Sequence, residues 1–152
     1  MKNAEVELFY LSALQYCSII ENFNFNNENN KLKNLLISLL SLYSKALYLP
    51  KVEPKNDEVP DFEISIPQIS FGKYNQYWEV FNPYYLEKPV VASLLDDTLD
   101  IYIDVKRGII LYENKEYLES IWEWKCNFEI HWGSHAVDAI RALHSVIFDD
   151  PY

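Results

Sequence analysis

Glycine is scarce in this chain: only Gly72, Gly108 and Gly133 occur among 152 residues. Folds made of many short strands need glycine and proline at their turns, whereas long helices do not. Long stretches of the chain instead carry apolar residues three and four positions apart, which is the helical period. Strand-like alternation is rare. The sequence therefore predicts an all-α protein.

The helical pattern predicts about five helices in antiparallel hairpins, with Asn3 capping the first and Ser93 the third. Asn114 is the predicted cap of the fourth. An uninterrupted pattern to Phe148 would form a helix about 50 Å long, so we divide it at Gly133. This glycine can end a helix in the left-handed conformation. The expected bounds are 4–23, 31–48, 93–113, 115–131 and 134–148.

Proline marks the middle of the chain, since five of the seven prolines lie between Pro50 and Pro83. Residues 62–66 alternate like a strand, but a single strand would have no partner. We predict a long ordered strap at about 50–90, with a helical turn at 77–82. The expected organisation is a single helical domain over 1–152. Its parts are an N-terminal hairpin (1–49), a connector strap (50–92) and a helical core (93–152).

The charge of the chain excludes several classes of partner. Thirteen basic and 23 acidic residues give a net charge of −10. Such a chain lacks the basic face that binds nucleic acid or an anionic membrane. No signal peptide or membrane span is recognisable, so a soluble, cytoplasmic protein is expected. Cys17 and Cys126 lie far apart in apolar stretches and are expected to be free, buried thiols.

An acidic stripe is the first candidate for chemistry. Asp97, Asp100 and Asp104 share one face of the predicted helix 93–113. The helix dipole favours acids in the first turn, but Asp100 and Asp104 lie beyond it. Three interpretations stay open: a solvated face, structural pairing with a cation, or a metal or ligand site. The candidate cations are Arg107, Lys125 and Arg141.

The histidines are the second candidate. His131, His135 and Asp138 would share a face on a continuous helix, and with acids from helix 93–113 they could bind zinc or iron. A break at Gly133 would turn His131 away from His135, and no zinc-protease motif is present. We therefore interpret these residues as polar groups at a helix junction. No cofactor is expected, because the chain also lacks a glycine-rich phosphate loop.

Several blocks in the second half of the chain resemble a known family. They are Glu79–Tyr84, Asp96–Ile101, Trp122–Trp124, Trp132–Gly133 and Ala139–Leu143. Their order and spacing are similar to those of the bacterial domain-of-unknown-function family 5063, over about residues 78–146. The family has no established activity, so the resemblance implies no functional residue.

A second, weaker resemblance lies within the same region. Gly108, Ser120 and Trp124 have the offsets of the small, small and aromatic positions of a tetratricopeptide repeat. Only one copy is present, and one repeat cannot bury its own face. The spacing therefore predicts a helical hairpin of similar shape, not a solenoid.

These observations favour a small non-catalytic interaction or regulatory protein, of the immunity-protein or adaptor type, whose acidic surface would suit a basic protein partner. The alternative is a metal-dependent enzyme that uses Asp100, Asp104, His135 and Asp138. In both cases the working surface is predicted between helix 93–113 and the corner near Gly133. The residues expected there are Asp100, Asp104, Trp124, His135, Asp138 and Arg141. A closed structural network, with Arg141 neutralising the acids, is the competing interpretation.

Overall fold

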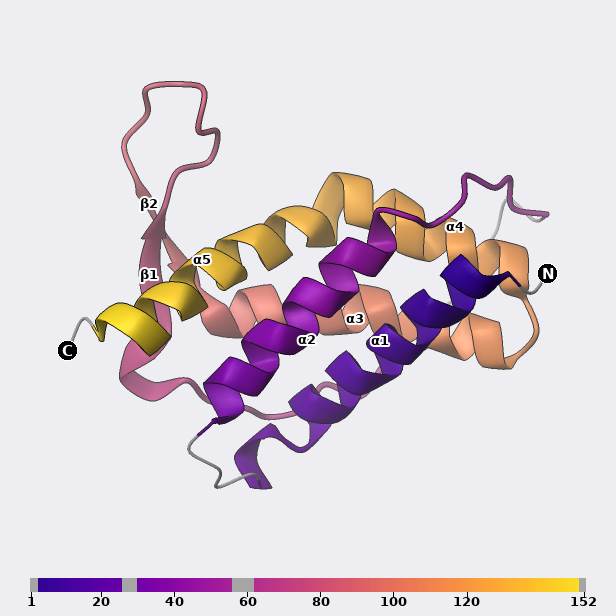
Figure 1. Cartoon of the computed structure of the whole chain (residues 1–152), viewed down its shortest axis with the longest axis horizontal. Coiled ribbons are helices and arrows are strands. Elements are labelled where there is room, and N and C mark those ends of the chain that lie inside the picture. The colour runs from indigo at the N-terminus through magenta and orange to yellow at the C-terminus, as the bar shows by residue number, and fades with distance from the viewer. Residues whose placement is uncertain (1–2, 26–29, 56–61, 151–152) are drawn as a thin grey trace.

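The computed structural model describes residues 3–25, 30–55 and 62–150 and is mostly helical, as the sequence predicts. Five α-helices account for most of these residues: α1 (Ala4–Glu21), α2 (Lys31–Ala46), α3 (Leu94–Glu113), α4 (Tyr117–Asn127) and α5 (Gly133–Asp149). A π-helical turn, η3 (Phe128–Trp132), joins α4 to α5. Figure 1 shows α1 and α2 lying across α3, while α5 continues the path of α4 beside them. No helix in the described part of the chain is long and apolar enough to cross a membrane.

Short polar side chains begin two of the helices where the sequence predicts. The Asn3 side chain accepts a hydrogen bond of 2.8 Å from the Val6 amide, and the Ser93 hydroxyl accepts one from the Asp96 amide. Both caps satisfy amides that a helix leaves unpaired at its start. The predicted cap at Asn114 is wrong. Asn114 ends α3, and Lys115 after it adopts a left-handed conformation with φ of 66°.

The α3–α4 hairpin is held by the three residues whose spacing resembles a helical repeat. The Ser120 hydroxyl donates to the Gly108 carbonyl oxygen at 2.7 Å. The Trp124 ring occupies the space where a Cβ at position 108 would lie, and its Nε1 donates to the Val105 carbonyl oxygen at 2.9 Å. Close approach of the two helices therefore requires glycine at this position.

The predicted break at Gly133 is wrong. Gly133 has helical angles (φ −61°, ψ −42°), and its amide donates to the carbonyl oxygen of Phe128, five residues earlier. The chain thus passes from α4 through η3 into α5 without leaving a helical path. A π-turn closes with one residue more than an α-turn, and this widened turn keeps the axis continuous. A Cβ at Gly133 would overlap the Phe128 carbonyl oxygen.

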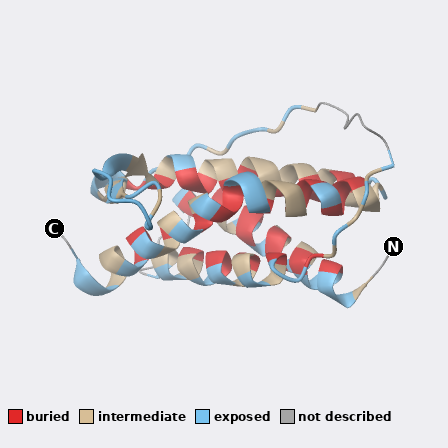
Figure 2. Cartoon of the chain, turned by 90° about the horizontal axis from the view of Figure 1, so that it is seen from above, coloured by how far each residue is buried: buried red, intermediate tan, exposed pale blue. Residues whose placement is uncertain are grey.

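The core contains apolar side chains from all five helices and from the segment before the strands. Phe9 of α1 contacts both Trp124 and Trp132, with ring centroids 4.8 Å and 6.1 Å apart. The Trp132 Nε1 donates to the Trp124 carbonyl oxygen at 3.1 Å. In Figure 2 the buried residues gather on the helix faces that are turned toward one another.

The predicted strap is only partly observed. Residues 50–55 and 62–71 lack regular structure, and residues 56–61 lie outside the described chain. Phe71 is buried against Phe23, which lies in the short 3₁₀ turn after α1 (η1, Phe23–Phe25). The Lys55 amide donates to the Glu119 carboxylate at 3.0 Å. Residues 76–93 form an antiparallel hairpin instead of the expected helical turn, with β1 (Gln76–Glu79) paired to β2 (Val90–Ser93). Figure 1 shows the hairpin projecting from the helical body.

We predict that Gly133→Ala destabilises the protein by about 1–3 kcal/mol, because the new methyl group must displace backbone at the π-turn. The expected loss of stability is steric, because Gly133 has a right-handed helical backbone and not the left-handed one that the sequence predicted. The measurement is urea unfolding followed by circular dichroism. Ser134→Ala, at the exposed neighbouring position, is the matched control and should unfold like the wild type. Equal stability of Gly133→Ala and the wild type would contradict the π-turn geometry.

Candidate functional site

Three carboxylates of α3 face two histidines on the η3–α5 path. Asp97, Asp100 and Asp104 lie at successive turns of α3, while His131 belongs to η3 and His135 to α5. The two imidazole rings pack edge to face, with centroids 4.9 Å apart. The continuous helical path brings both rings to one side, so the predicted separation of His131 from His135 is wrong.

Each histidine contacts two of the carboxylates through its two ring nitrogens. His131 Nδ1 lies 2.6 Å from Asp104 and its Nε2 lies 3.9 Å from Asp100. His135 Nδ1 lies 2.7 Å from Asp97 and its Nε2 lies 3.2 Å from the same Asp100 oxygen. A carboxylate only accepts hydrogen bonds, so the short contacts place a proton on each Nδ1. Both Nε2 atoms therefore face Asp100.

Burial and hydrogen bonds change the proton affinity of these groups. The hydrogen bond to Asp97 raises the pKa of His135, because it favours the charged imidazolium. Burial raises the pKa of Asp104, although the hydrogen bond with His131 opposes the shift. The Tyr77 hydroxyl of β1 donates to the other oxygen of Asp97. Burial, together with this bond, raises the pKa of Tyr77, so the phenol stays a donor.

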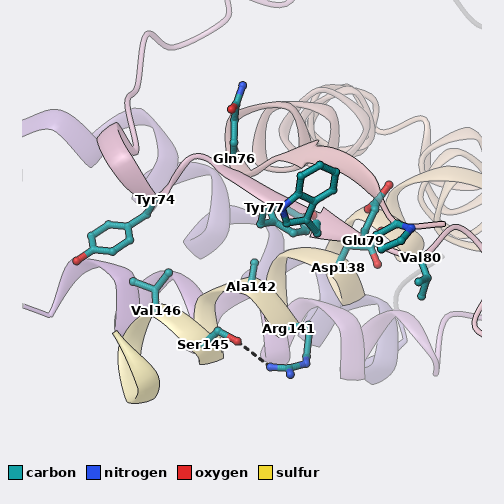
Figure 3. A pocket seen from close by; sticks show the side chains of 12 residues that line it. Tyr74, Gln76, Tyr77, Glu79, Val80, Asp138, Arg141, Ala142, Ser145 and Val146 are labelled. Carbon is teal, nitrogen blue, oxygen red and sulfur yellow. Dashed lines mark hydrogen bonds between the residues drawn. The ribbon is translucent and has the colours of Figure 1, made fainter. Parts of the chain in front are cut away.

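A groove of about 590 Å³ adjoins this cluster, between β1 and α5 (Figure 3). Its walls are mainly apolar, and Tyr77 and Asp138 lie at the boundary with the histidine–carboxylate cluster. We call it the β1–α5 groove; it is lined by Tyr74, Gln76, Tyr77, Trp78, Glu79, Val80, Pro89, Asp138, Arg141, Ala142, Ser145 and Val146. Its volume is in the range of small-molecule sites.

Two carboxyl groups meet inside the groove, with Glu79 on β1 and Asp138 on α5 (Figure 3). Burial raises the pKa of Asp138 to about 7, and a hydrogen bond to Glu79 adds to the shift. The carboxylate of Asp97 raises it further, while the His135 ring lowers it. Up to about pH 7 the Asp138 carboxyl therefore holds a proton, which it shares with Glu79 through this hydrogen bond.

The structure brings together only part of the predicted surface. Asp100, Asp104 and His135 lie in one cluster, and Asp138 lies in the adjoining groove. Within the described residues Arg141 forms no ion pair with the α3 acids, and its guanidinium donates to Ser145 at 2.8 Å. Trp124 is fully buried and presents no surface. The histidines, not an arginine, pair with the α3 acids.

Sequence reasoning left four residues of this arrangement out of the predicted working surface. It set His131 aside because of the expected helix break and assigned Asp97 to the helix dipole. The spacing of His131 and His135, four residues apart, was the signal that could have placed the two rings together. Nothing in the sequence pairs Tyr77 or Glu79 with α3 or α5, because those contacts depend on the hairpin.

The remaining histidine and the cysteines lie outside the site. His144 packs against Phe148 at a tilted angle, with ring centroids 4.8 Å apart. Cys17 and Cys126 are both free, as expected, but Cys126 is only partly buried, so the prediction that both are buried is wrong for it. Cys17 is buried, and burial raises the pKa of its thiol to about 12, so it carries no thiolate at neutral pH.

Comparison with known proteins assigns the fold and the family. The profile of a domain of unknown function (DUF5063) matches residues 2–149. The chain belongs to this family. The match includes the N-terminal helices, which the sequence resemblance over residues 78–146 did not cover. A search of curated proteins found no match.

The chain is also similar to a solved structure, that of protein BF1032 from Bacteroides fragilis. The sequences are 24% identical, the TM-score is 0.77, and the similarity covers 96% of this chain and 94% of that one. At this identity the likeness shows that the DUF5063 chain has the same fold as BF1032, and nothing about activity.

We predict that Asp138→Asn raises the melting temperature more at pH 8 than at pH 5. In the wild type the folded pKa is about 7 and the ordinary value is 3.8. The unfolded chain therefore releases this proton first, and the free energy of unfolding falls as pH rises from about 4 to about 7. Asparagine stays neutral and removes this loss. Thermal melts at both pH values test it, with Glu87→Gln in the exposed hairpin loop as control. An equal effect of Asp138→Asn at both values would contradict the shared proton.

Proposed function

We propose that the protein is a non-catalytic interaction or regulatory module that binds a basic protein partner through its β-hairpin and the β1–α5 groove. The observation that carries the proposal is the exposure of the hairpin's apolar side chains. A role of the immunity-protein or adaptor type would use such a surface, because both act by holding another protein.

The hairpin loop, residues 80–89, carries large side chains that no described part of the chain covers. Phe81, Tyr84 and Leu86 are 85%, 93% and 105% exposed. Trp78 and Tyr85 beside them are also exposed. Contiguous exposed apolar groups are unfavourable in water unless a partner covers them, and aromatic residues commonly anchor interfaces. The loop is therefore suited to insert into a partner.

Charge supports a basic partner. The chain carries a net charge of −10, and the groove below the loop contains the Glu79–Asp138 pair. A lysine or arginine side chain of the partner would replace the shared proton and leave both carboxylates ionised. Opposite charge on the two proteins would also speed their encounter, an effect that salt weakens.

A metal-dependent enzyme is a second candidate, because one specific observation favours it. The Nε2 atoms of His131 and His135 face the Asp100 carboxylate, and the β1–α5 groove adjoins this cluster. A metal ion next to a groove of small-molecule size is a common arrangement in enzymes. The binding of an ion is the part of this candidate that can be tested first.

We predict that Phe81→Ser with Leu86→Ser weakens partner binding by at least about tenfold, because truncating a buried anchor costs more than about 1.4 kcal/mol. The partner is first captured from the cells that make this protein, then purified and titrated by calorimetry. Raising the salt concentration should weaken binding if the partner is basic.

Leu11→Ser with Leu47→Ser is the matched control, since both leucines are 60% exposed and lie away from the hairpin. This control should bind like the wild type. The proposal is wrong if the hairpin variant binds as tightly as the control.

A further inference from the structure

We propose that Asp100, His131 and His135 bind one divalent first-row transition-metal ion. This inference is independent of partner binding through the hairpin. The three side chains offer ligand atoms that all lie within 4.8 Å of one another. They come from α3, η3 and α5, so the bound ion would link α3 to the η3–α5 path.

The distances are close to those of a bound site. An ion with bonds of 2.0–2.1 Å in a tetrahedral arrangement holds its ligand atoms about 3.3 Å apart. The Nε2 of His135 already lies 3.2 Å from Asp100 Oδ2, and the Nε2 of His131 lies 3.9 Å from the same oxygen. The remaining pair of ligand atoms, one from each imidazole, lies within 4.8 Å.

Neighbouring carboxylates hold both rings in the orientation that metal binding requires. Metal-ligating histidines usually donate their other ring N–H to a carboxylate, which fixes the tautomer and makes the ligand more basic. Asp104 does this for His131 at 2.6 Å, and Asp97 does it for His135 at 2.7 Å. Asp97 is itself buried and held by the Tyr77 hydroxyl. Both histidines therefore have the same arrangement: Nδ1 bonds to a supporting carboxylate, and Nε2 faces Asp100.

The ligand set selects the class of ion. Imidazole nitrogens suit Zn²⁺, Fe²⁺ and similar ions, whereas Ca²⁺ and Mg²⁺ prefer oxygen ligands alone. Three protein ligands leave at least one position for water or another ligand, as in catalytic zinc sites. Solvent reaches this position, because His131 and Asp100 are both partly exposed. A π-turn at His131 fits this function, since such turns are frequent at functional sites.

The competing interpretation is a network of ion pairs without a metal. In that case a proton on His135 Nε2 would bridge to Asp100, and no ion would be needed. Metal binding separates the two interpretations directly. The full-length protein, treated with EDTA and dialysed, is titrated with Zn²⁺ by calorimetry and with Co²⁺ by visible absorption. We expect one ion per chain, a Co²⁺ d–d spectrum of low coordination number, and a higher melting temperature with Zn²⁺.

Two single substitutions test the ligands without disturbing the core. Asp100→Asn and His131→Gln change partly exposed side chains, and far-ultraviolet circular dichroism checks that both variants fold. Loss of a neighbouring carboxylate typically weakens metal affinity about 10–100-fold, so we expect this range for Asp104→Ala and a larger loss for either ligand variant. His144→Gln removes an exposed histidine from helix α5 and should bind Zn²⁺ like the wild type.

Three results would overturn the proposal. The first is no saturable Zn²⁺ or Co²⁺ binding by the wild type. The second is wild-type affinity in folded Asp100→Asn and His131→Gln. The third is an equal loss of affinity in His144→Gln, which would indicate adventitious binding to surface histidines.

Discussion

The contact between Trp124 and Gly108 determines how the rest of the structure is arranged. The indole ring fills the space that a side chain at position 108 would need, and its Nε1 donates to the Val105 carbonyl oxygen. These contacts set the observed register of α4 against α3. The Trp132 Nε1 then bonds to the Trp124 carbonyl oxygen, which carries this register into the π-turn. Asp104 directly precedes Val105, and His131 directly precedes Trp132. The packing of the two tryptophans therefore also brings the Asp104 carboxylate next to the His131 ring.

The acidic face of α3 depends on this register for its neutralisation. Like charges three and four residues apart on a helix repel each other by a few tenths of a kcal/mol per pair, and partial burial of Asp104 makes its charge more costly. His131 and His135 supply the hydrogen-bond donors, and Tyr77 supplies a further donor to Asp97. The hairpin thereby becomes part of the cluster, and the β1–α5 groove forms beside it. Charge neutralisation and groove formation thus have one structural origin.

Local signals in the sequence were sufficient for most of the helical fold. Asn3 and Ser93 cap the helices that they were expected to cap, and the apolar period places α1, α2 and α3 within a few residues of their observed bounds. The spacing of Gly108, Ser120 and Trp124 predicted the hairpin contact. The π-turn escaped prediction because it differs from an α-turn by one residue in the hydrogen-bond pattern, which leaves no clear mark on apolar spacing. The hairpin escaped prediction because its strands have four residues each, too few for an alternating pattern.

The sequence by itself determined the helical class, the caps at Asn3 and Ser93, the acidic stripe on α3 and the free cysteines. These properties depend on residues a few positions apart, where backbone geometry is regular. Only the tertiary structure decided which groups meet the acids. His131 lies 27 residues from Asp104, His135 lies 38 from Asp97, and Tyr77 lies 20 from Asp97. Such contacts depend on helix register and on the rotation added by one π-turn, and a shift of one residue there moves a side chain about 100° around the helix.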